Sequence, residues 1–531
     1  MADHRPLSGL RVCELSIAIA APTCGKYLAY FGADVVKVES DQNPDVIRLL
    51  ARDTGVALGE FNAGKRSVGL DLKKPAGAEV MRSLLASSDV FVSNYTAPAL
   101  RRLGLSYDDV AAVRPDIVYA ALPGFGSDPT KPYYDYVAWG PNQAPLVGLE
   151  GLTGVEGHDP SGIATISYPD YSSGVHAVVA ILAELRRRAV TGAGAFIDLS
   201  QMEATVSLLG PLVLAHQRTG VTPSAAGNRQ PGITQGVYPC AGQDRWVAIE
   251  VDGDGEWRAL ARVAGHPEWA DDPRVATAAA RVANHAVVDD LLAAWTCRHT
   301  PSELAHWLQA AGVAAAPVAD NETLALDPQL AARHFWALAP HPRVGTDLFT
   351  GVPIRLGATP GRFDTSGPPF AEHTLDVLSE RCGHDPAGVE ELVGDGVAWL
   401  PSVDPAEPTD RPWRGWIRAL FPDLDWDGAG RPVADLTAEA HRSRLAVDAD
   451  GSVRERSLAG VRVVALGGPE IAQAIRILSG LGADVAVVEP PGGGRLRATP
   501  AGDAASGAVE EGLWHAAFAR ECTSAVVDLD T

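Results

Sequence analysis

Apolar residues recur at helical spacing within the segment SYPDYSSGVHAVVAILAELRRR, residues 167–188. The spacing predicts one helix with one buried face. The apolar positions are Val175, Val178, Val179, Leu182 and Leu185. Three arginines and then Gly192 close the pattern, as is typical of a helix C-terminus. Asp170 therefore lies at or just before the helix N-terminus, where two interpretations remain open: an N-cap, or a nucleophilic carboxylate that the helix end keeps ionised.

Two segments of the chain share one pattern. The first starts LSGLRVCEL and reaches GADVVKVES, and the second starts LAGVRVVAL and reaches GADVAVVEP. Each predicts a strand, a helix that ends at a glycine (Gly32 or Gly482), a tight turn and a second strand, which is a parallel βαβ unit. A further strand follows in each copy, as SVGLDL and as SAVVDLD. The shared order indicates an internal duplication.

The repeat sets the expected domain boundaries. We expect a first domain over residues 1–398, with a smaller subdomain at about 225–335 that is mostly helical from residue 260. In that subdomain, Thr300 and Glu303 have the spacing of a capping box. Residues 399–456, rich in Pro, Asp and Trp, predict a linker, and 457–531 a partial second copy. Because so short a unit cannot cover both faces of a parallel sheet, we expect either that the chain continues beyond Thr531 or that this copy packs on the first.

Composition narrows the choice of partners. The 531 residues carry a formal net charge of −22, which argues against nucleic acid or an anionic membrane as partner. Six scattered cysteines without metal-ligand spacing favour free thiols in a reducing compartment and predict no metal site. The N-terminus is polar and no long apolar run follows, so we expect a cytoplasmic protein. The first βα turn, ELSIAIAAPTCG, has no G-x-G-x-x-G, which makes dinucleotide binding unlikely.

Seven further segments occur in a defined order between about residue 7 and about residue 380. They read LSGLRVCEL…GADVVKVE, NAGKRSVGLDLKKPAG (62–77), DVFVSNYTAPALRRLGLSYDDV (89–110), PDIVYAALPGFGSD (115–128), TGAGAFIDLSQMEA (191–204), AGNRQPG (226–232) and GVAAAPV (312–318). As an ordered set they resemble the class III CoA-transferases, the formyl-CoA transferase and carnitine CoA-transferase (CaiB/BaiF) family. The resemblance implies an α/β fold with an open, parallel, Rossmann-like sheet and a smaller helical or irregular domain.

The resemblance also implies a reaction. Asp170 matches the family's nucleophile, which transfers coenzyme A from an acyl-CoA to an acceptor carboxylic acid through aspartyl anhydride and aspartyl-CoA thioester intermediates. CoA thioester is then a substrate, and no permanently bound cofactor is expected. The implied partners are an acyl-CoA, a small carboxylic acid and a second copy of the chain in an interlocked homodimer.

Further site residues are carried over by the same resemblance. The expected CoA-binding residues are Leu70, Asp71, Leu72, Lys73, Asn94, Tyr95, Arg102 and Trp139, and the expected substrate loop is Gly227, Asn228, Arg229 and Gln230. Lys73 and Arg102 supply the cations that a polyanion requires. Three choices stay open: Lys65 and Arg66 as CoA contacts or a solvated turn, Tyr95 as an adenine platform or part of the sheet surface, and Arg229 as a partner for the acceptor carboxylate or a surface residue.

The chain departs from the family pattern in ways that keep alternatives open. Trp139 and Gly140 stand where the family often has a Tyr–Glu pair, and Ile19 stands where some members have a polar residue. The alternatives are an acyl-CoA isomerase, racemase or lyase on the same fold, or a non-catalytic partner of a two-domain enzyme. A racemase would pair the aspartate with a histidine; His158 is expected in an exposed loop and His176 off the face of Asp170.

Overall fold

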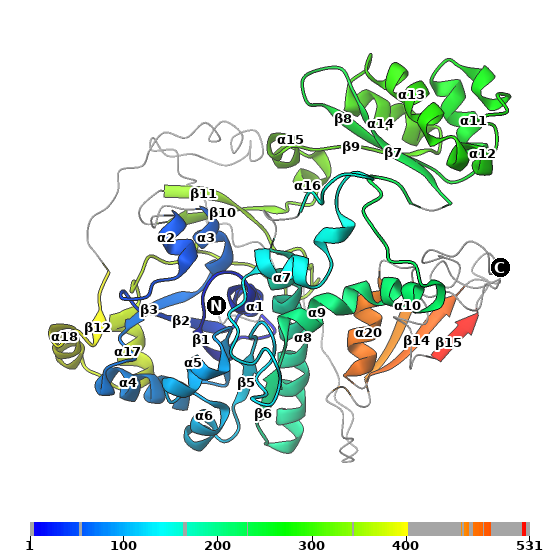
Figure 1. Cartoon of the computed structure of the whole chain (residues 1–531). Coiled ribbons are helices and arrows are strands. Elements are labelled where there is room, and N and C mark those ends of the chain that lie inside the picture. The colour runs from blue at the N-terminus through cyan, green and yellow to red at the C-terminus, as the bar shows by residue number, and fades with distance from the viewer. Residues whose placement is uncertain are drawn as a thin grey trace.

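The computed structural model describes residues 5–51, 56–162, 167–230, 232–341, 345–401, 458, 461–466, 471–481, 483–489 and 523–526. Its largest element is a seven-stranded sheet in the order β12-β3-β2-β1-β4-β5-β6 (Figure 1). The strands are β1 (Arg11–Leu15), β2 (Asp34–Glu39), β3 (Arg66–Leu70), β4 (Val90–Ser93), β5 (Val118–Ala121), β6 (Ala195–Asp198) and β12 (Ala398–Trp399). Every neighbouring pair is parallel except β12 and β3. The predicted parallel α/β sheet is confirmed, and its chain order reverses between β1 and β4, where such sheets form a ligand-binding crevice.

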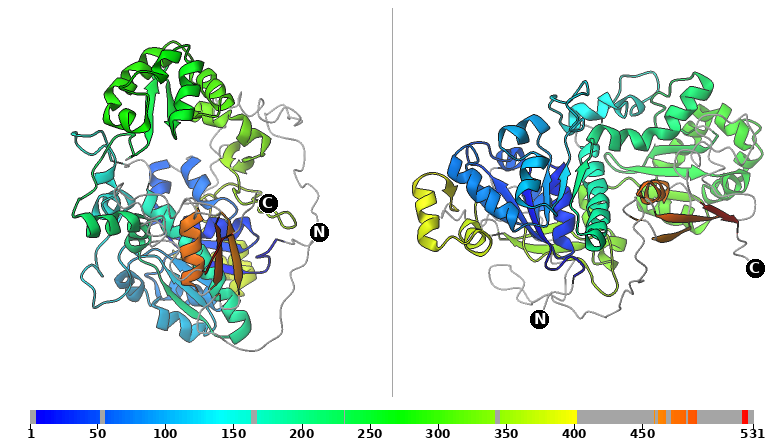
Figure 2. Two further views of the ribbon diagram at one scale, coloured as in Figure 1. Left: turned by 90° about the vertical axis from the view of Figure 1, so that its right-hand side faces the viewer. Right: turned by 90° about the horizontal axis from the view of Figure 1, so that it is seen from below.

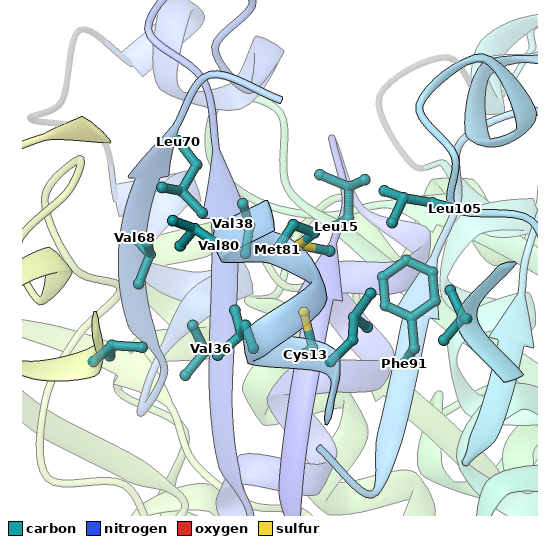
Figure 3. Packing of buried hydrophobic residues seen from close by; sticks show 14 of the residues in the cluster. Cys13, Leu15, Val36, Val38, Val68, Leu70, Val80, Met81, Phe91 and Leu105 are labelled. Carbon is teal, nitrogen blue, oxygen red and sulfur yellow. The ribbon is translucent and has the colours of Figure 1, made fainter. Parts of the chain in front are cut away.

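Helices cover both faces of this sheet, so most residues of β1 to β5 are buried on both sides. One face packs against α1 (Ala20–Tyr30) and α8 (Tyr168–Thr191). On the other face, Val80 and Met81 of α4 lie over the apolar side chains of the strands (Figure 3). The elements on that face are α4 (Pro75–Ala86), α5 (Ala97–Arg102), α6 (Tyr107–Val113), α17 (Thr374–Cys382) and α18 (Pro386–Gly394).

Shorter elements connect and flank the main sheet. They are α2 (Val46–Ala51), α3 (Val56–Asn62), α7 (Gly140–Leu146), η1 (Glu150–Leu152), α9 (Gln201–Val206), η2 (Ser207–Leu209), α10 (Gly210–Thr219), α15 (Asn321–Ala325) and α16 (Pro328–Ala332). An antiparallel hairpin, β10 (Trp336–His341) and β11 (Gly345–Thr350), returns the chain to the main sheet. There Phe349 packs with Tyr30 of α1 and with Phe363.

The smaller unit has a core of its own around an antiparallel sheet, β7 (Thr234–Pro239), β8 (Trp246–Val251) and β9 (Ala314–Pro317). Its helices are α11 (Asp254–Val263), η3 (Pro267–Ala270), α12 (Ala278–Ala283), α13 (His285–Thr296) and α14 (Pro301–Ala310). Trp257, Trp269 and Trp295 are buried between these helices and the sheet. The predicted capping box is confirmed, since Thr300 and Glu303 bond each other's backbone N–H groups.

The C-terminal unit is a second parallel βαβ arrangement, β13 (Arg462–Leu466), α20 (Ala472–Gly480), β14 (Asp484–Glu489) and β15 (Thr523–Val526). Helix α20 lies on one face of its strands (Figure 2). The Asp484 N–H donates to the Val461 carbonyl at 2.7 Å, as the Asp34 N–H donates to the Leu10 carbonyl at 2.8 Å in the first unit. Gly482 and most of the predicted linker, from residue 402 to 457, lie outside the described residues.

Helix α8 differs from its sequence prediction in two respects. Gly192 ends it in the left-handed conformation, as predicted, but Ser167 is the N-cap residue and Asp170 is the third residue of the helix. The N-cap interpretation of Asp170 is therefore wrong. The predicted buried face is confirmed only in part, because Val178 and Leu185 pack against the core whereas Val175 and Leu182 are exposed. The buried positions are Pro169, Asp170, Ser173, Gly174, Ala177, Ile181 and Ala183, most of them small.

Small residues are buried because α8 lies very close to α1. A Cβ at Gly174 would lie 2.7 Å from the Ala20 carbonyl oxygen and 2.8 Å from the Cβ of Thr23. Only a residue without a side chain lets the two backbones approach this closely. The close contact fixes the N-terminus of α8 against the N-terminus of α1.

Gly174→Ala should separate α1 from α8. We expect the free energy of unfolding to fall by about 1–3 kcal/mol, as in other overpacked cores, and activity to fall by about 10²-fold because Asp170 moves. Thermal unfolding and steady-state kinetics check both effects.

Gly255→Ala is the matched control, because Gly255 also lies in a helix but its added Cβ would have no atom within 4 Å. Equal melting and equal activity of the two variants would contradict the close contact.

Candidate active site

The Asp170 carboxyl group is buried beside the N-terminus of α1. The residue is 7% exposed, and the backbone N–H groups of Ala20 and of Asp170 itself lie close to its carboxyl group. Burial raises its pKa from 3.8 to about 6, although these two N–H groups act in the opposite direction. Among the described residues, no cationic side chain contributes to this pKa shift. Asp170 is therefore a partly dehydrated carboxyl group that faces backbone donors.

Gly140, the first residue of α7, borders the same carboxyl group. A Cβ at position 140 would overlap Asp170 Oδ2 and would lie 2.6 Å from the Cβ of Ser167. In this arrangement the space that a side chain at position 140 would need is occupied by Asp170. Gly140 thus brings the backbone of α7 directly against the carboxyl group.

The loop between β1 and α1 leads directly to Ala20, and side chains hold it in place at Ile17 and Ala18. Asn94, which follows β4, accepts from the Ile17 N–H at 3.0 Å and donates to the Ile17 carbonyl at 2.7 Å. Asp45 accepts from the Ala18 N–H at 3.0 Å. Ala18 has a φ of 59°, a left-handed conformation that is strained for alanine. Side chains from two neighbouring strands therefore hold this loop in an unfavourable conformation.

A buried charge cluster lies beneath the loop and consists of Glu14, Lys37, Asp45 and Lys65. Lys37 Nζ lies 2.9 Å from Asp45 Oδ2, and Lys65 Nζ lies 2.9 Å from both carboxylate oxygens of Glu14. Each of the four is at most 1% exposed. Neither alternative left open for Lys65, a CoA contact or a solvated turn, agrees with this position. Arg66 forms ion pairs with Asp34 and Glu380.

The expected CoA-binding residues follow the carboxyl ends of β3 and β4 on either side of the crevice. Leu70 and Asp71 are buried, Leu72 is half-buried, and Asp71 accepts from the Lys73 N–H at 3.0 Å. Lys73 and Arg102 are exposed cations. Parallel strands end at one edge of the sheet, so these residues and the β1–α1 loop share that edge.

The remaining expected CoA-binding residues, Asn94, Tyr95 and Trp139, differ in their burial and contacts. The amide of Asn94 bonds Ile17, as described above, and Tyr95 is partly buried with a pKa that burial raises. Trp139 precedes α7 and is 43% exposed, and its N–H donates to Asn142 at 2.7 Å.

Comparison with known proteins identifies the family. The model of CoA-transferase family III matches residues 7–374. The chain belongs to this family. It is 31% identical over 384 residues to the succinyl-CoA–D-citramalate CoA-transferase of Chloroflexus aurantiacus, which covers 71% of this chain and 94% of that protein. It is 32% identical over 413 residues to a probable CoA-transferase of Mycobacterium tuberculosis, covering 75% of this chain and 51% of that protein.

A solved structure supports the same assignment. The crystal structure of a CaiB/BaiF family protein from Brucella suis superimposes with a TM-score of 0.65 at 30% identity, covering 71% of this chain and 99% of that chain. The protein is therefore a CoA-transferase, an enzyme class whose substrates are CoA thioesters.

The expected substrate loop of the enzyme, residues 227–230, is exposed. Arg229 forms ion pairs with Asp289 at 2.8 Å and with Glu156 at 3.7 Å, and the Gly227 N–H donates to the Gly154 carbonyl. Asn228 lines a hollow on the outer face of the β7–β9 sheet. The described contacts of this loop thus connect it to the smaller unit and to the segment before α8.

The histidines considered for a racemase have other surroundings. His158 is exposed, and Nδ1 of His176 lies 2.7 Å from the Ser172 carbonyl. Within the described ranges, no group of three His, Cys, Asp or Glu residues could hold a metal ion, and no helix is long and apolar enough to cross a membrane.

The raised pKa of Asp170 predicts how activity depends on pH. A nucleophilic carboxylate must be ionised, and the group is protonated below about pH 6. We therefore expect kcat/KM to fall about tenfold per pH unit below about pH 6. A pH profile from 4.5 to 8 that stays flat across this range would contradict the assignment.

Stability should show the opposite trend. Between about pH 4 and pH 6 the folded protein holds a proton that the unfolded chain has lost, so stability falls as pH rises, by about 3 kcal/mol in total. Asp170→Asn lacks this titration, so its melting temperature should rise relative to the wild type from pH 4 to pH 7. If the difference in melting temperature between the variant and the wild type did not change with pH, the pKa of Asp170 would not be raised.

Proposed function

We propose that the protein transfers CoA from an acyl-CoA to a carboxylic acid with Asp170 as nucleophile. The observation that carries the proposal is the buried Asp170 carboxyl group, which lies beside the Ala20 N–H within the fold of a CoA-transferase. A carboxylate is a weak nucleophile, and partial dehydration raises its reactivity. Backbone N–H groups also stabilise the oxyanions that form when a thioester or an anhydride is attacked.

The proposed reaction proceeds in four balanced steps. The Asp170 carboxylate attacks the acyl-CoA carbonyl, the C–S bond breaks, and an acyl-aspartyl anhydride and CoA thiolate form. The thiolate attacks the aspartyl carbonyl, which releases the first acid and leaves an aspartyl-CoA thioester. The acceptor carboxylate attacks that thioester and forms a second anhydride with release of thiolate. The thiolate then attacks the acceptor's acyl carbon, which yields the new acyl-CoA and regenerates Asp170.

The remaining site residues have proposed roles at the same sheet edge. Lys73 and Arg102 contact the CoA phosphates, and the segment from Leu70 to Leu72 lines the nucleotide. Asn94 and Tyr95 border the crevice beside them. Trp139 contacts the acyl-CoA near the thioester, and the loop from Gly227 to Gln230 contacts the acceptor acid. The relative named above supports succinyl-CoA as the first donor to test.

Asp170→Asn should abolish covalent loading. With succinyl-CoA or formyl-CoA as donor, the wild type should give a hydroxylamine-sensitive adduct on the peptide that contains Asp170, detected by mass spectrometry. The amide is a far poorer nucleophile, so CoA transfer by the variant should fall at least about 10³-fold.

Asp271→Asn, at an exposed carboxylate, is the matched control and should retain full transfer. Undiminished transfer by Asp170→Asn, after deamidation back to Asp has been excluded, would rule out the mechanism. A panel of acyl-CoAs also separates the alternatives, since a racemase exchanges an α-proton and a non-catalytic partner forms no adduct.

We further propose that residues 1–398 form one transferase domain with a subdomain at about 225–335, and that 457–531 is a partial second copy after a linker at 399–456. The matching strand order and hydrogen bonds of the βαβ units support this division. The probable CoA-transferase of Mycobacterium tuberculosis also supports it, because the region that matches this chain is 51% of that protein. Of the five cysteines in the described ranges, all are unpaired and three are buried, which supports the proposal of a cytoplasmic location.

Dimer formation is proposed from an exposed apolar stripe on α8. Tyr168, Tyr171, Val175 and Leu182 are each at least 40% exposed and share one side of the helix beside Asp170. Light scattering after size exclusion should give the mass of a dimer, and Val175→Glu should shift it toward the monomer. An active wild-type monomer at micromolar concentration would contradict the proposal.

A further inference from the structure

The two βαβ units have the same backbone geometry but different interiors. In the first unit, the Leu7 and Ala33 N–H groups donate to the carbonyls of Phe31 and Leu28. In the second unit, the Leu458 and Ala483 N–H groups donate to the carbonyls of Leu481 and Leu478. These bonds and the strand registers align the strands and helices of the two units, whereas the segment between the first two strands is one residue shorter in the second unit. The second unit is thus an internal control for what this backbone requires.

At the cluster positions that the structure describes in the second unit, apolar residues replace the charges. Glu14 aligns with Ala465 and Lys37 aligns with Val487, and both apolar residues are buried. In the sequence, Cys522 stands where Lys65 precedes the third strand. The same βαβ backbone therefore forms with apolar residues at these positions.

The residue of α1 that faces the cluster, Gly25, is also replaced in the second unit. A Cβ at Gly25 would overlap the Glu14 carboxylate, so a buried Glu14 requires a glycine there. Gly25 aligns with Ile475, which is buried at 3% exposure. In the second unit a large apolar side chain fills the space that Glu14 takes in the first. The charged set and the apolar set are thus two complete alternatives for one interior.

Burying four charges is unfavourable unless their partners compensate, and buried ion pairs can often be replaced by apolar residues without loss of stability. The fold alone does not explain the cluster, but its contacts with the β1–α1 loop do. Lys37 Nζ donates to the Ser16 carbonyl at 3.0 Å, and Lys65 Nζ donates to the Pro22 carbonyl at 2.9 Å. With the bond from Asp45 to the Ala18 N–H, the cluster holds the loop on both sides of Ala20.

We propose that the buried charge cluster of Glu14, Lys37, Asp45 and Lys65 is a positioning device, which keeps the β1–α1 loop in its strained form so that the Ala20 N–H faces Asp170. The four residues do not touch the reacting atoms. They act through the backbone of the loop. This inference rests on the proposed function of Asp170, and it explains why the first unit carries Glu14 and Lys37 where the second carries the buried apolar residues Ala465 and Val487.

A combined replacement tests the proposal. The swap variant carries Glu14→Ala, Gly25→Ile, Lys37→Val and Lys65→Cys, as in the second unit, with Asp45→Asn to leave no unpaired charge. We expect it to fold, by circular dichroism and thermal melting, and amide hydrogen exchange in residues 16–20 to be at least about tenfold faster than in the wild type. Loading of Asp170 from succinyl-CoA should slow by about 10²-fold in a single turnover.

Single substitutions separate positioning from general stability. Asp45→Ala removes the acceptor for the Ala18 N–H and should slow loading far more than Asp45→Asn, which keeps an acceptor oxygen there. Arg381→Met is the matched control, because it removes another buried charge that bonds Ser88 at the opposite edge of the sheet. It should lower the melting temperature without changing exchange in residues 16–20 or the rate of loading.

The outcomes distinguish this inference from the proposed function. A swap variant that fails to fold would overturn the inference, as would a folded one with wild-type exchange in residues 16–20. Wild-type loading by Asp45→Ala would also overturn it. Absence of loading in the wild type would refute the nucleophile, whereas the exchange measurement would still decide whether the cluster holds the loop.

Discussion

The structure depends on one close contact, the approach of α8 to α1 at Gly174. Because position 174 has no side chain, the N-termini of the two helices meet, and the Ala20 N–H of one faces the Asp170 carboxyl group of the other. The same contact buries that group and raises its pKa. A bulkier residue at the contact would loosen the helix packing and the site together. Packing and chemistry are thus determined by the same few atoms.

The residues around the end of β1 have features that are energetically unfavourable by themselves. The loop before α1 contains a left-handed alanine and lies over four buried charges, features that a fold alone does not favour. They occur where the chain order of the sheet reverses, the usual place for a ligand in such folds. The C-terminal unit builds the same βαβ backbone with an apolar interior, which indicates that the charges serve the site.

Much of the fold was predictable from periodicity and turn residues. The parallel strands, the two βαβ units, the end of α8 at Gly192 and the capping box at Thr300 all follow from local patterns and are present. The buried face of α8 was only partly predictable from apolar spacing, because the close helix contact selects small residues and leaves Val175 and Leu182 exposed. The charge cluster joins residues from two strands and two loops, so no local pattern reveals it.

The most direct measurement follows oxygen atoms into Asp170. In the proposed mechanism, the acceptor acid leaves one of its carboxylate oxygens on Asp170 in each turnover. Turnover of succinyl-CoA with succinate labelled with ¹⁸O in both carboxylates should therefore place one heavy oxygen on the peptide that contains Asp170, visible by mass spectrometry after digestion. Transfer of CoA to the labelled acid without any heavy oxygen on Asp170 would contradict the account.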